Sequence, residues 1–450
     1  MRQLFGTDGM RGVAGKPPLD PVTLYKLGHA LVTSLVRRGV VKPRVAIGED
    51  TRESCGWICA AMAHGVRDAG GEPVTAGVLP TPGLALVTRE GSFAAGLMIS
   101  ASHNPFEDNG IKVFDAKGAK LPDEDELALE YLIGAAPTPR SVAEVTHDGF
   151  TDAHRALQEG YLAFLARCMD GTRLDGLKVV LDTAHGAAHQ LAPEAFRRAG
   201  AQVITLGDAP DGRNINAGFG SLHPERMAVA VAEHGADLGF SFDGDADRCI
   251  GATKRGRILD GDFALYYAGR ALRRAGRLPN ATVVATVMSN FGLEKALSEE
   301  GIHMLRAAVG DRYVLAAMQE GGFTVGGEQS GHVIFLDHAP TGDGTLTALT
   351  LTRLWREGAG DLDEALDRIP RYPQRLKNTR VREKPRIEDH PALAAAVRRA
   401  EGQLGGEGRV VVRYSGTEPL ARVMIEGPDQ ALVDRLVDEV LEVFRAEVGA

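Results

Sequence analysis

The chain has 450 residues, which is too many for one hydrophobic core, so we expect roughly three or four domains. Hydrophobic residues make up 44% of the chain and charged residues 25%, as in ordinary soluble globular proteins. The net charge of −9 argues against nucleic acid as a partner, because a phosphate backbone attracts a basic surface. Local arginines and lysines can still form a positive pocket for a small anion.

Targeting and membrane signals are weak in this sequence. The first residues lack an apolar run of signal-peptide length, and no internal run approaches a membrane span. The four cysteines follow neither a disulfide scaffold nor a paired metal-binding spacing. We therefore expect a cytoplasmic protein with no membrane partner.

Strands alternate with helices along most of the chain, which is typical of α/β proteins with mainly parallel pairing. The first set has expected helices at 23–38 and up to about residue 68, and expected strands at 44–48, 74–78 and 96–99. A helix at 153–169 then leads to expected strands at 177–182, 201–206 and 236–242. A third set of strands is expected at 281–288, 302–305 and 323–326. The glycine-rich segment 5–12, taken alone, predicts a flexible entry to the first strand.

Breaks in this alternation suggest the domain boundaries. A stretch rich in Pro and Ala at 134–139 and a Pro-containing linker at 369–373 interrupt the pattern. We expect three similar α/β domains at 1–150, 151–252 and 253–368, and a small α+β domain at 369–450. The elements expected in the last domain are helices at 391–404 and 429–447 and strands at 409–414 and 421–426.

The loop that follows the strand at 238–242 carries three carboxylates at alternate positions, Asp243, Asp245 and Asp247. Such a set can converge on one hard cation. An EF-hand would need Gly at its sixth and Glu at its twelfth position, where this chain has Arg248 and Lys254. Because three like charges this close repel one another, we favour a Mg²⁺ site over a solvated acidic turn. Arg248 beside it suits a phosphate oxygen.

Ser102 lies in a second loop, where the apolar run 96–99 ends at 100–105 in two serines, a histidine and an Asn-Pro break. A serine at a strand end is commonly a helix cap or a turn residue. A hydrolase nucleophile would need flanking glycines, which are absent. The third interpretation is a phosphoserine whose phosphate completes the metal site. His103 is then a base or phosphate donor, and Lys112 an electrostatic partner.

Two further loops follow strands. Glu328 and Ser330 lie between glycines at 326–331, where they either recognise sugar hydroxyls or belong to a tight surface turn. His332, whose reference pKa is near neutral, is a candidate general base. At 413–419 an arginine, hydroxyls and a glycine share one loop with Arg422 nearby, which favours an anion site of backbone amides and a forked cation.

Taken together and in this order, these motifs resemble those of the α-D-phosphohexomutases. The resemblance covers essentially the whole chain and is carried by 100–105, 243–248, 327–332 and 413–419, all without departure from the family pattern. The segment 6–12, Gln329 and the Ser-Gly-Thr form of the last loop resemble the branch of the family that acts on amino sugars.

The resemblance implies four domains around a central cleft, the first three α/β with mixed sheets and the fourth a small α+β unit. It implies that Ser102 is phosphorylated in the active enzyme and that its phosphate holds Mg²⁺ together with Asp243, Asp245 and Asp247. The positions that match residues near the reacting groups are Arg11, His103, Lys112, Arg248 and His332. The sugar-hydroxyl readers would be Glu328 and Ser330, and the clamp on the distal phosphate would be Arg413, Ser415, Gly416, Thr417 and Arg422.

The activity implied is the reversible conversion of glucosamine 6-phosphate to glucosamine 1-phosphate, with a hexosamine or hexose 1,6-bisphosphate as intermediate and primer. The product would feed the synthesis of UDP-N-acetylglucosamine and so the cell envelope. A mutase for mannose or glucose phosphates would share every catalytic residue, and a phosphatase or a sugar-phosphate binder is a rival of another class. The small-molecule partner is a sugar phosphate, and a homodimer is the assembly to test.

Overall fold

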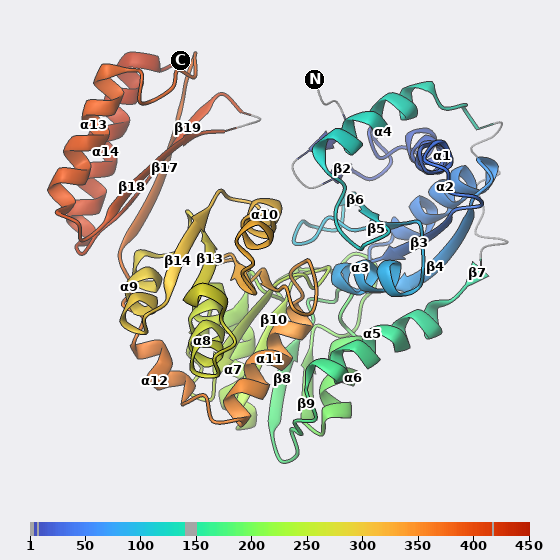
Figure 1. Cartoon of the computed structure of the whole chain (residues 1–450), viewed down its shortest axis with the longest axis horizontal. Coiled ribbons are helices and arrows are strands. Elements are labelled where there is room, and N and C mark those ends of the chain that lie inside the picture. Colours follow the sequence, from blue (N-terminus) through green and yellow to red (C-terminus); the bar gives the residue numbers. More distant parts are fainter. Residues whose placement is uncertain (1–3, 7–8, 140–150, 416–417) are drawn as a thin grey trace.

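The computed structural model describes residues 4–6, 9–139, 151–415 and 418–450. In Figure 1 the chain follows an open arc, with the N-terminal unit at upper right and the C-terminal unit at upper left. Two middle units lie below and join them. Each unit is built on its own sheet, and the four sheets have seven, five, four and three strands.

The first sheet has the order β1-β2-β6-β5-β3-β4-β7. Its strands are β1 (Phe5–Gly6), β2 (Gly9–Val13), β3 (Arg44–Glu49), β4 (Glu72–Val78), β5 (Ala95–Ile99), β6 (Asp108–Asp115) and β7 (Thr151–Asp152). Its helices are α1 (Pro21–Arg37), α2 (Cys55–Asp68), α3 (Thr81–Glu90) and α4 (Asp123–Ala135). Asp20 caps α1 by accepting from the backbone N–H groups of Val22 and Thr23, both at 3.1 Å, and Pro21 occupies the first turn.

One edge of this sheet departs from the expected parallel pairing. β3 pairs in parallel with β4 and β5, but β5–β6, β6–β2 and β2–β1 are antiparallel. The interpretation of 5–12 as a flexible entry is wrong for its described part, since Gly9–Val13 is a strand in register with β6. Gly9 has a φ of +79° and its Cα lies against the Ile111 carbonyl, where a side chain would clash.

The second sheet has the order β12-β11-β10-β8-β9. Its strands are β8 (Lys178–Asp182), β9 (Gln202–Leu206), β10 (Leu238–Phe242), β11 (Cys249–Thr253) and β12 (Ile258–Leu259), and its helices are α5 (His154–Cys168), α6 (Leu191–Ala199) and α7 (Pro224–His234). All five residues of β10 are buried, as expected for a central strand covered on both faces. The loop after this strand carries the three aspartates.

The third sheet has the order β14-β13-β15-β16. Its strands are β13 (Thr282–Thr286), β14 (His303–Ala307), β15 (Val325–Gly327) and β16 (Val333–Phe335). The helices of this part of the chain are α8 (Gly261–Arg274), α9 (Phe291–Glu299), α10 (Asp311–Gly321), α11 (Gly344–Arg356) and α12 (Leu362–Asp367). β15 and β16 form a short hairpin that carries the loop with Glu328 and Ser330.

The C-terminal unit is an antiparallel sheet of order β17-β19-β18, formed by β17 (Gln374–Arg380), β18 (Arg409–Tyr414) and β19 (Leu420–Glu426). It is covered by α13 (Pro391–Leu404) and α14 (Gln430–Val448). The sequence did not predict β17, which begins directly after the linker at 369–373. With three α/β units on mixed sheets and a small α+β unit, the expected fold class is confirmed.

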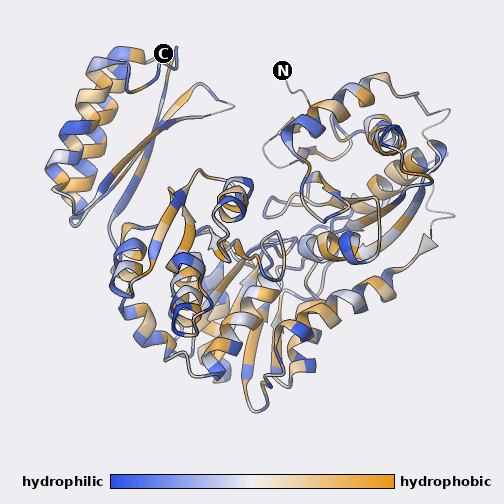
Figure 2. Ribbon diagram, viewed as in Figure 1, coloured by the Kyte–Doolittle hydropathy of each residue, from blue (hydrophilic) through white to orange (hydrophobic). Residues whose placement is uncertain are grey.

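The hydrophobic cores divide the molecule differently from the sheets. One continuous core runs through the first three units, from Ala46 to Ala365, whereas the core of the C-terminal unit lies entirely within 381–448. Figure 2 shows the helices with mixed hydrophobic and hydrophilic turns, as expected where one face packs on a sheet. The four cysteines are free and buried. Among the described residues, no helix is long and apolar enough to cross a membrane.

The separate core predicts that the C-terminal unit can lose stability on its own. Phe444→Ala removes a fully buried ring from this core, which costs about 3–5 kcal/mol. Differential scanning calorimetry should show a lower transition for this unit and an unchanged transition for the rest. Val443→Ala, at a half-buried position on the same helix, should lower the transition of the C-terminal unit less. Equal lowering of every transition by Phe444→Ala would contradict an independent C-terminal core.

Candidate functional site

Ser102 lies in the loop between β5 and β6 and is 2% exposed. Its backbone has a φ of +53°, in the left-handed region that L-residues rarely adopt. The hydroxyl donates to Asp243 Oδ2 at 2.6 Å, so the serine loop of the first unit meets the acidic loop of the second. The strain of this backbone and the buried hydroxyl are unlike a solvated turn serine.

The three aspartates converge as the sequence predicts. Carboxylate oxygens of Asp243, Asp245 and Asp247 lie within 4.8 Å of one another, and all three residues are buried. Burial, followed by the charges of Asp247 and Asp245, raises the pKa of Asp243 to about 8. Buried carboxylates this close repel one another, and a bound cation would relieve that repulsion.

Lys112, from β6, provides part of the compensating charge. Its Nζ lies 2.8 Å from Asp245 Oδ2 and 3.2 Å from Asp247 Oδ2. Burial alone would raise the pKa of Asp247, but Lys112 and His332 hold it well below its usual range. The other oxygens, Oδ1 of Asp245 and of Asp247, are buried and have no hydrogen-bond partner among the described residues. Unsatisfied hard oxygens beside the Ser102 hydroxyl fit a divalent cation such as Mg²⁺.

His103 and Arg248 flank the serine hydroxyl. His103 Nδ1 lies 3.3 Å from Ser102 Oγ and 3.3 Å from Arg248 Nη1. Burial, with the nearby cations Arg248 and Arg11, lowers the pKa of His103, so this ring is neutral at physiological pH. The Arg248 backbone N–H donates to Asp243 Oδ1 at 3.1 Å, which ties its position to the acidic loop.

His332 is fully buried beside the acidic loop, with Nδ1 3.6 Å from Asp247 Oδ1. Its Nε2 accepts the backbone N–H of Gly342 at 3.1 Å, which leaves the Nδ1 proton facing Asp247. Burial alone would lower the pKa of His332, but Asp247 raises it. The ring is thus hydrogen-bonded through Nε2, and its Nδ1 faces the carboxylate of Asp247.

These loops surround one cavity of about 540 Å³. The lining includes six of the predicted site residues, which are Arg11, His103, Asp247, Arg248, Glu328 and His332. Phe5, Gly6 and Gly9 of the glycine-rich segment 5–12 also line the cavity. The sequence did not single out the other lining residues, which are Leu4, Lys120, Val309, Gly310, Asp311 and Arg312. Lys120 of the first unit and Asp311 of the third form an ion pair of 2.6 Å at its border.

The loop with Glu328 and Ser330 is held from several sides, so it is not a loose surface turn. Glu328 Oε1 accepts the backbone N–H of Gly310 at 3.0 Å, and Ser330 Oγ donates to Glu328 Oε2 at 3.2 Å. The Gln329 side chain donates to Asp262 Oδ2 at 3.2 Å. Glu328 therefore faces the cavity with its carboxylate oriented by backbone, a geometry suited to a hydroxyl donor.

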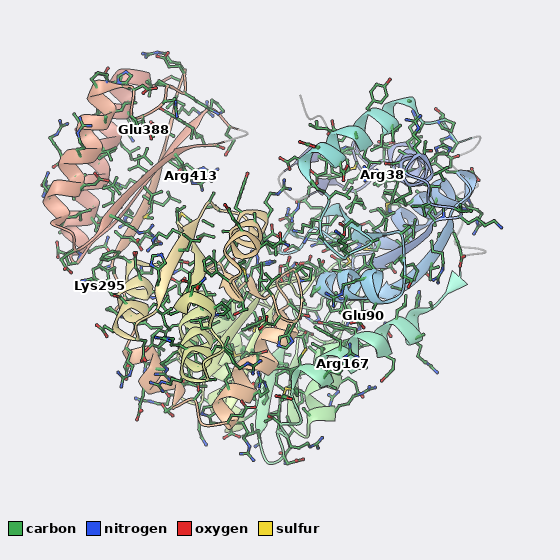
Figure 3. All side chains as sticks on the ribbon, in the orientation of Figure 1. Arg38, Glu90, Arg167, Lys295, Glu388 and Arg413 are labelled. Atoms are coloured by element: carbon green, nitrogen blue, oxygen red, sulfur yellow. The ribbon has the colours of Figure 1, made fainter. Side chains whose placement is uncertain are left out.

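The expected phosphate clamp lies apart from this cavity, on the C-terminal unit. Arg413 and Arg422 stand opposite each other in the β18–β19 ladder, and Arg422 forms an ion pair of 3.1 Å with Glu418. Burial and then Arg422 lower the pKa of Arg413. Ser415 Oγ accepts the backbone N–H of Glu418 at 3.2 Å. Figure 3 marks Arg413 on this unit, which stands across from the N-terminal unit. Gly416 and Thr417 lie outside the described residues.

The sequence did not reveal how the serine loop is held. Arg52, which lies in the polar segment after β3, donates to the carbonyls of Ser102 and Asn104 at 3.0 and 2.8 Å. Asn216 of the second unit donates to the same two carbonyls at 2.9 and 3.1 Å. The sole sequence signal was that polar residues follow the strand β3.

Comparison with known families identifies the class of protein. The chain matches the family models of all four phosphoglucomutase/phosphomannomutase domains. Alpha/beta/alpha domain I matches residues 2–139, domain II 159–256, domain III 260–372 and the C-terminal domain 376–443. The chain therefore belongs to this family of phosphohexomutases and is an isomerase of the intramolecular phosphotransferase kind.

Within this family, the chain is similar over its full length to phosphoglucosamine mutases. The chain is 48% identical to phosphoglucosamine mutase of Solibacter usitatus over 454 residues, with 100% of this chain and 99% of the relative covered. It is 47% identical to that of Symbiobacterium thermophilum over 448 residues, with both chains fully covered. It is 48% identical to that of Thermus thermophilus, with 99% and 98% covered.

Solved structures agree on the fold. A phosphoglucomutase/phosphomannomutase family protein from Burkholderia thailandensis superposes with a TM-score of 0.78 at 23% identity, covering 98% of this chain and 97% of that one. An Aspergillus fumigatus N-acetylphosphoglucosamine mutase, solved in complex with GlcNAc-6P and magnesium, gives a TM-score of 0.67 at 19% identity, with 99% and 96% covered. At this identity the match supports the architecture.

The repulsion within the aspartate cluster predicts cation-dependent stability. Mg²⁺ should raise the midpoint of thermal unfolding, since a ligand at 100 times its Kd stabilises by about 2.7 kcal/mol. Asp245→Asn should require at least about tenfold more Mg²⁺ for the same rise, because one charged ligand is lost. Asp237→Asn, a carboxylate outside the cluster, should behave as the unchanged protein. If Mg²⁺ does not change the unfolding midpoint of the unchanged protein, the predicted metal site is contradicted.

Proposed function

We propose that this chain interconverts glucosamine 6-phosphate and glucosamine 1-phosphate through a phosphate carried on Ser102. The observation that carries the proposal is the 2.6 Å contact between Ser102 Oγ and Asp243 within a buried cluster of three aspartates. A phosphate on this hydroxyl would lie directly beside the unsatisfied carboxylate oxygens. The full-length relatives named phosphoglucosamine mutase support the choice of sugar.

The transfer would conserve atoms and charge. The Oγ–P bond of phosphoserine 102 breaks, a bond forms between phosphorus and the C1 hydroxyl oxygen of the sugar, and the hydroxyl proton ends on Ser102 Oγ. The product is a 1,6-bisphosphate, which turns in the cavity and returns its 6-phosphate to Ser102 by the reverse step. Mg²⁺, held by Asp243, Asp245, Asp247 and the phosphate, would neutralise the negative charge of the transferred group.

The surrounding side chains have distinct roles in this proposal. Lys112 and Arg248 supply positive charge to the transferred phosphoryl group, and His103 is poised within hydrogen-bonding reach of Ser102 Oγ. Arg11 also lines the cavity and adds positive charge there. His332 is a candidate for moving the proton of the sugar hydroxyl.

Recognition would use two loops on different units. Glu328 and Ser330 bind the sugar hydroxyls, and the C-terminal loop with Arg413, Ser415 and Arg422, together with Gly416 and Thr417, clamps the phosphate that is not reacting. Either end of the bisphosphate must fit this clamp in turn. A C-terminal unit with its own core could move as a lid while the intermediate turns.

Several expectations belong to the same proposal. A hexosamine or hexose 1,6-bisphosphate would prime an unphosphorylated enzyme, and the product would feed synthesis of UDP-N-acetylglucosamine. We expect a cytoplasmic protein whose partner is a sugar phosphate, and a homodimer as the assembly to test. The domain boundaries near 150, 252 and 368 also stay predictions.

The proposed activity is tested by turnover on glucosamine, glucose and mannose 6-phosphates with Mg²⁺ and trace bisphosphate. The expected result is the highest kcat/KM on glucosamine 6-phosphate and no net release of inorganic phosphate. Ser102→Ala should lower kcat by at least about 10³-fold, because the phosphate carrier is lost, whereas exposed Ser298→Ala should not. Preferred turnover of mannose or glucose phosphate would favour the related mutases, and net phosphate release would favour a phosphatase.

The clamp predicts a different kinetic signature. Arg413→Gln removes a charge-assisted hydrogen bond to phosphate, worth about 1.5–3 kcal/mol, so KM should rise about 10- to 100-fold. Initial rates over a range of glucosamine 6-phosphate concentrations measure this change. Arg435→Gln, on the exposed face of α14, is the matched control and should leave KM unchanged. An unchanged KM in Arg413→Gln would remove this arginine from the clamp.

A further inference from the structure

Arg52 is the most completely hydrogen-bonded arginine around the serine loop. It follows β3, and its side chain is wholly buried. Its Nε donates to Asp50 Oδ2 at 2.9 Å, and its Nη2 donates to the carbonyls of Ser102 and Asn104 at 3.0 and 2.8 Å. Its Nη1 donates to the carbonyl of Asp108 at 3.0 Å and to that of Pro105. All five N–H donors of the guanidinium are used, three of them on carbonyls of the serine loop and one on the carbonyl of Asp108 at the start of β6.

Asp50 extends this hydrogen-bond network to the backbone N–H side of Ser102. Its Oδ2 accepts the hydroxyl of Ser100 at 2.6 Å, and Ser100 Oγ in turn accepts the backbone N–H of Ser102 at 2.9 Å. The N–H of Ser102 is thus tied to Asp50 through Ser100, while its carbonyl is tied to Arg52. The buried ion pair therefore fixes the peptide groups on both sides of Ser102.

Asn216 completes the arrangement from the second unit. Its Nδ2 shares the carbonyls of Ser102 and Asn104 with Arg52, so each of these oxygens receives two donors. A carbonyl oxygen has two lone pairs, and both are used here. Backbone in the left-handed region persists only where the surroundings over-determine it, and this network supplies that constraint on Ser102.

We infer that Arg52 is a positioning residue, which holds the strained serine loop so that the Ser102 oxygen points at the aspartate cluster in both the phosphorylated and the free enzyme. The inference rests on the proposed phosphoserine role of Ser102. The positive charge of Arg52 is matched by Asp50, so its contribution is geometric. Lysine cannot replace it, because an ammonium has three donors and no planar fork.

Arg52→Lys keeps the charge beside Asp50 and loses at least two donors to the loop. The rate of phosphoryl transfer from phosphorylated enzyme to glucosamine 6-phosphate, measured by rapid quench, should fall on the order of 10²-fold. KM should stay within about twofold, because the sugar and phosphate loops are elsewhere. Arg270→Lys is the matched control, since Arg270 is also buried and donates to the Ala359 carbonyl at 2.8 Å, away from the serine loop.

If Arg52 only stabilised the fold, Arg52→Lys and Arg270→Lys would both have a lower unfolding midpoint and would transfer phosphate at similar rates. Should Arg52→Lys not fold, Ser100→Ala decides, because it cuts only the link to the Ser102 N–H and should slow transfer about tenfold at constant KM. A transfer rate within about twofold of that of the unchanged protein in Arg52→Lys, or in Ser100→Ala if that variant decides, would overturn the positioning role of Arg52. So would equal slowing in Arg270→Lys. Either result would leave the proposed function standing. If the unchanged protein transfers no phosphate, the proposed function and the inference fall together.

Discussion

The contact between the Ser102 hydroxyl and Asp243 joins two units of the chain at the centre of the proposed chemistry. It brings the Ser102 hydroxyl to three buried carboxylates, where burial, followed by the charges of Asp247 and Asp245, raises the pKa of Asp243 to about 8. Such a cluster is costly in a folded protein, and Lys112 offsets part of that cost. The buried oxygens of Asp245 and Asp247 that have no hydrogen-bond partner among the described residues fit a bound divalent cation.

The architecture serves this contact by bringing loops from separate sheets to one place. The loop after β5 supplies Ser102, the loop after β10 supplies the aspartates, and the β15–β16 hairpin supplies Glu328. One continuous core unites these three units, so the geometry among their loops is rigid. The C-terminal unit has its own core and carries Arg413 and Arg422, a division that suits a fixed reaction centre and a movable clamp.

Most strands and the loops of the candidate site could be predicted from the sequence, because their signals lie within short segments of the chain. Apolar runs such as 96–99 and 238–242 end abruptly in polar loops, and the spacing of Asp243, Asp245 and Asp247 falls within one loop. β17 was missed because most of its residues are polar and exposed, so no apolar alternation marks it. Arg52 and Asn216 were missed because they bind backbone carbonyls of a distant loop, and such contacts leave no spacing in the sequence.

The central claim, that Ser102 carries the phosphate that reaches the sugar, is tested most directly by following that phosphate. The protein is labelled with ³²P from a labelled 1,6-bisphosphate, freed of excess label and mixed with glucosamine 6-phosphate and Mg²⁺. The account predicts label on Ser102 at the start, its loss from the protein within the time of turnover, and its appearance in glucosamine phosphates. Label that never enters Ser102, or that leaves it as inorganic phosphate, would contradict the account.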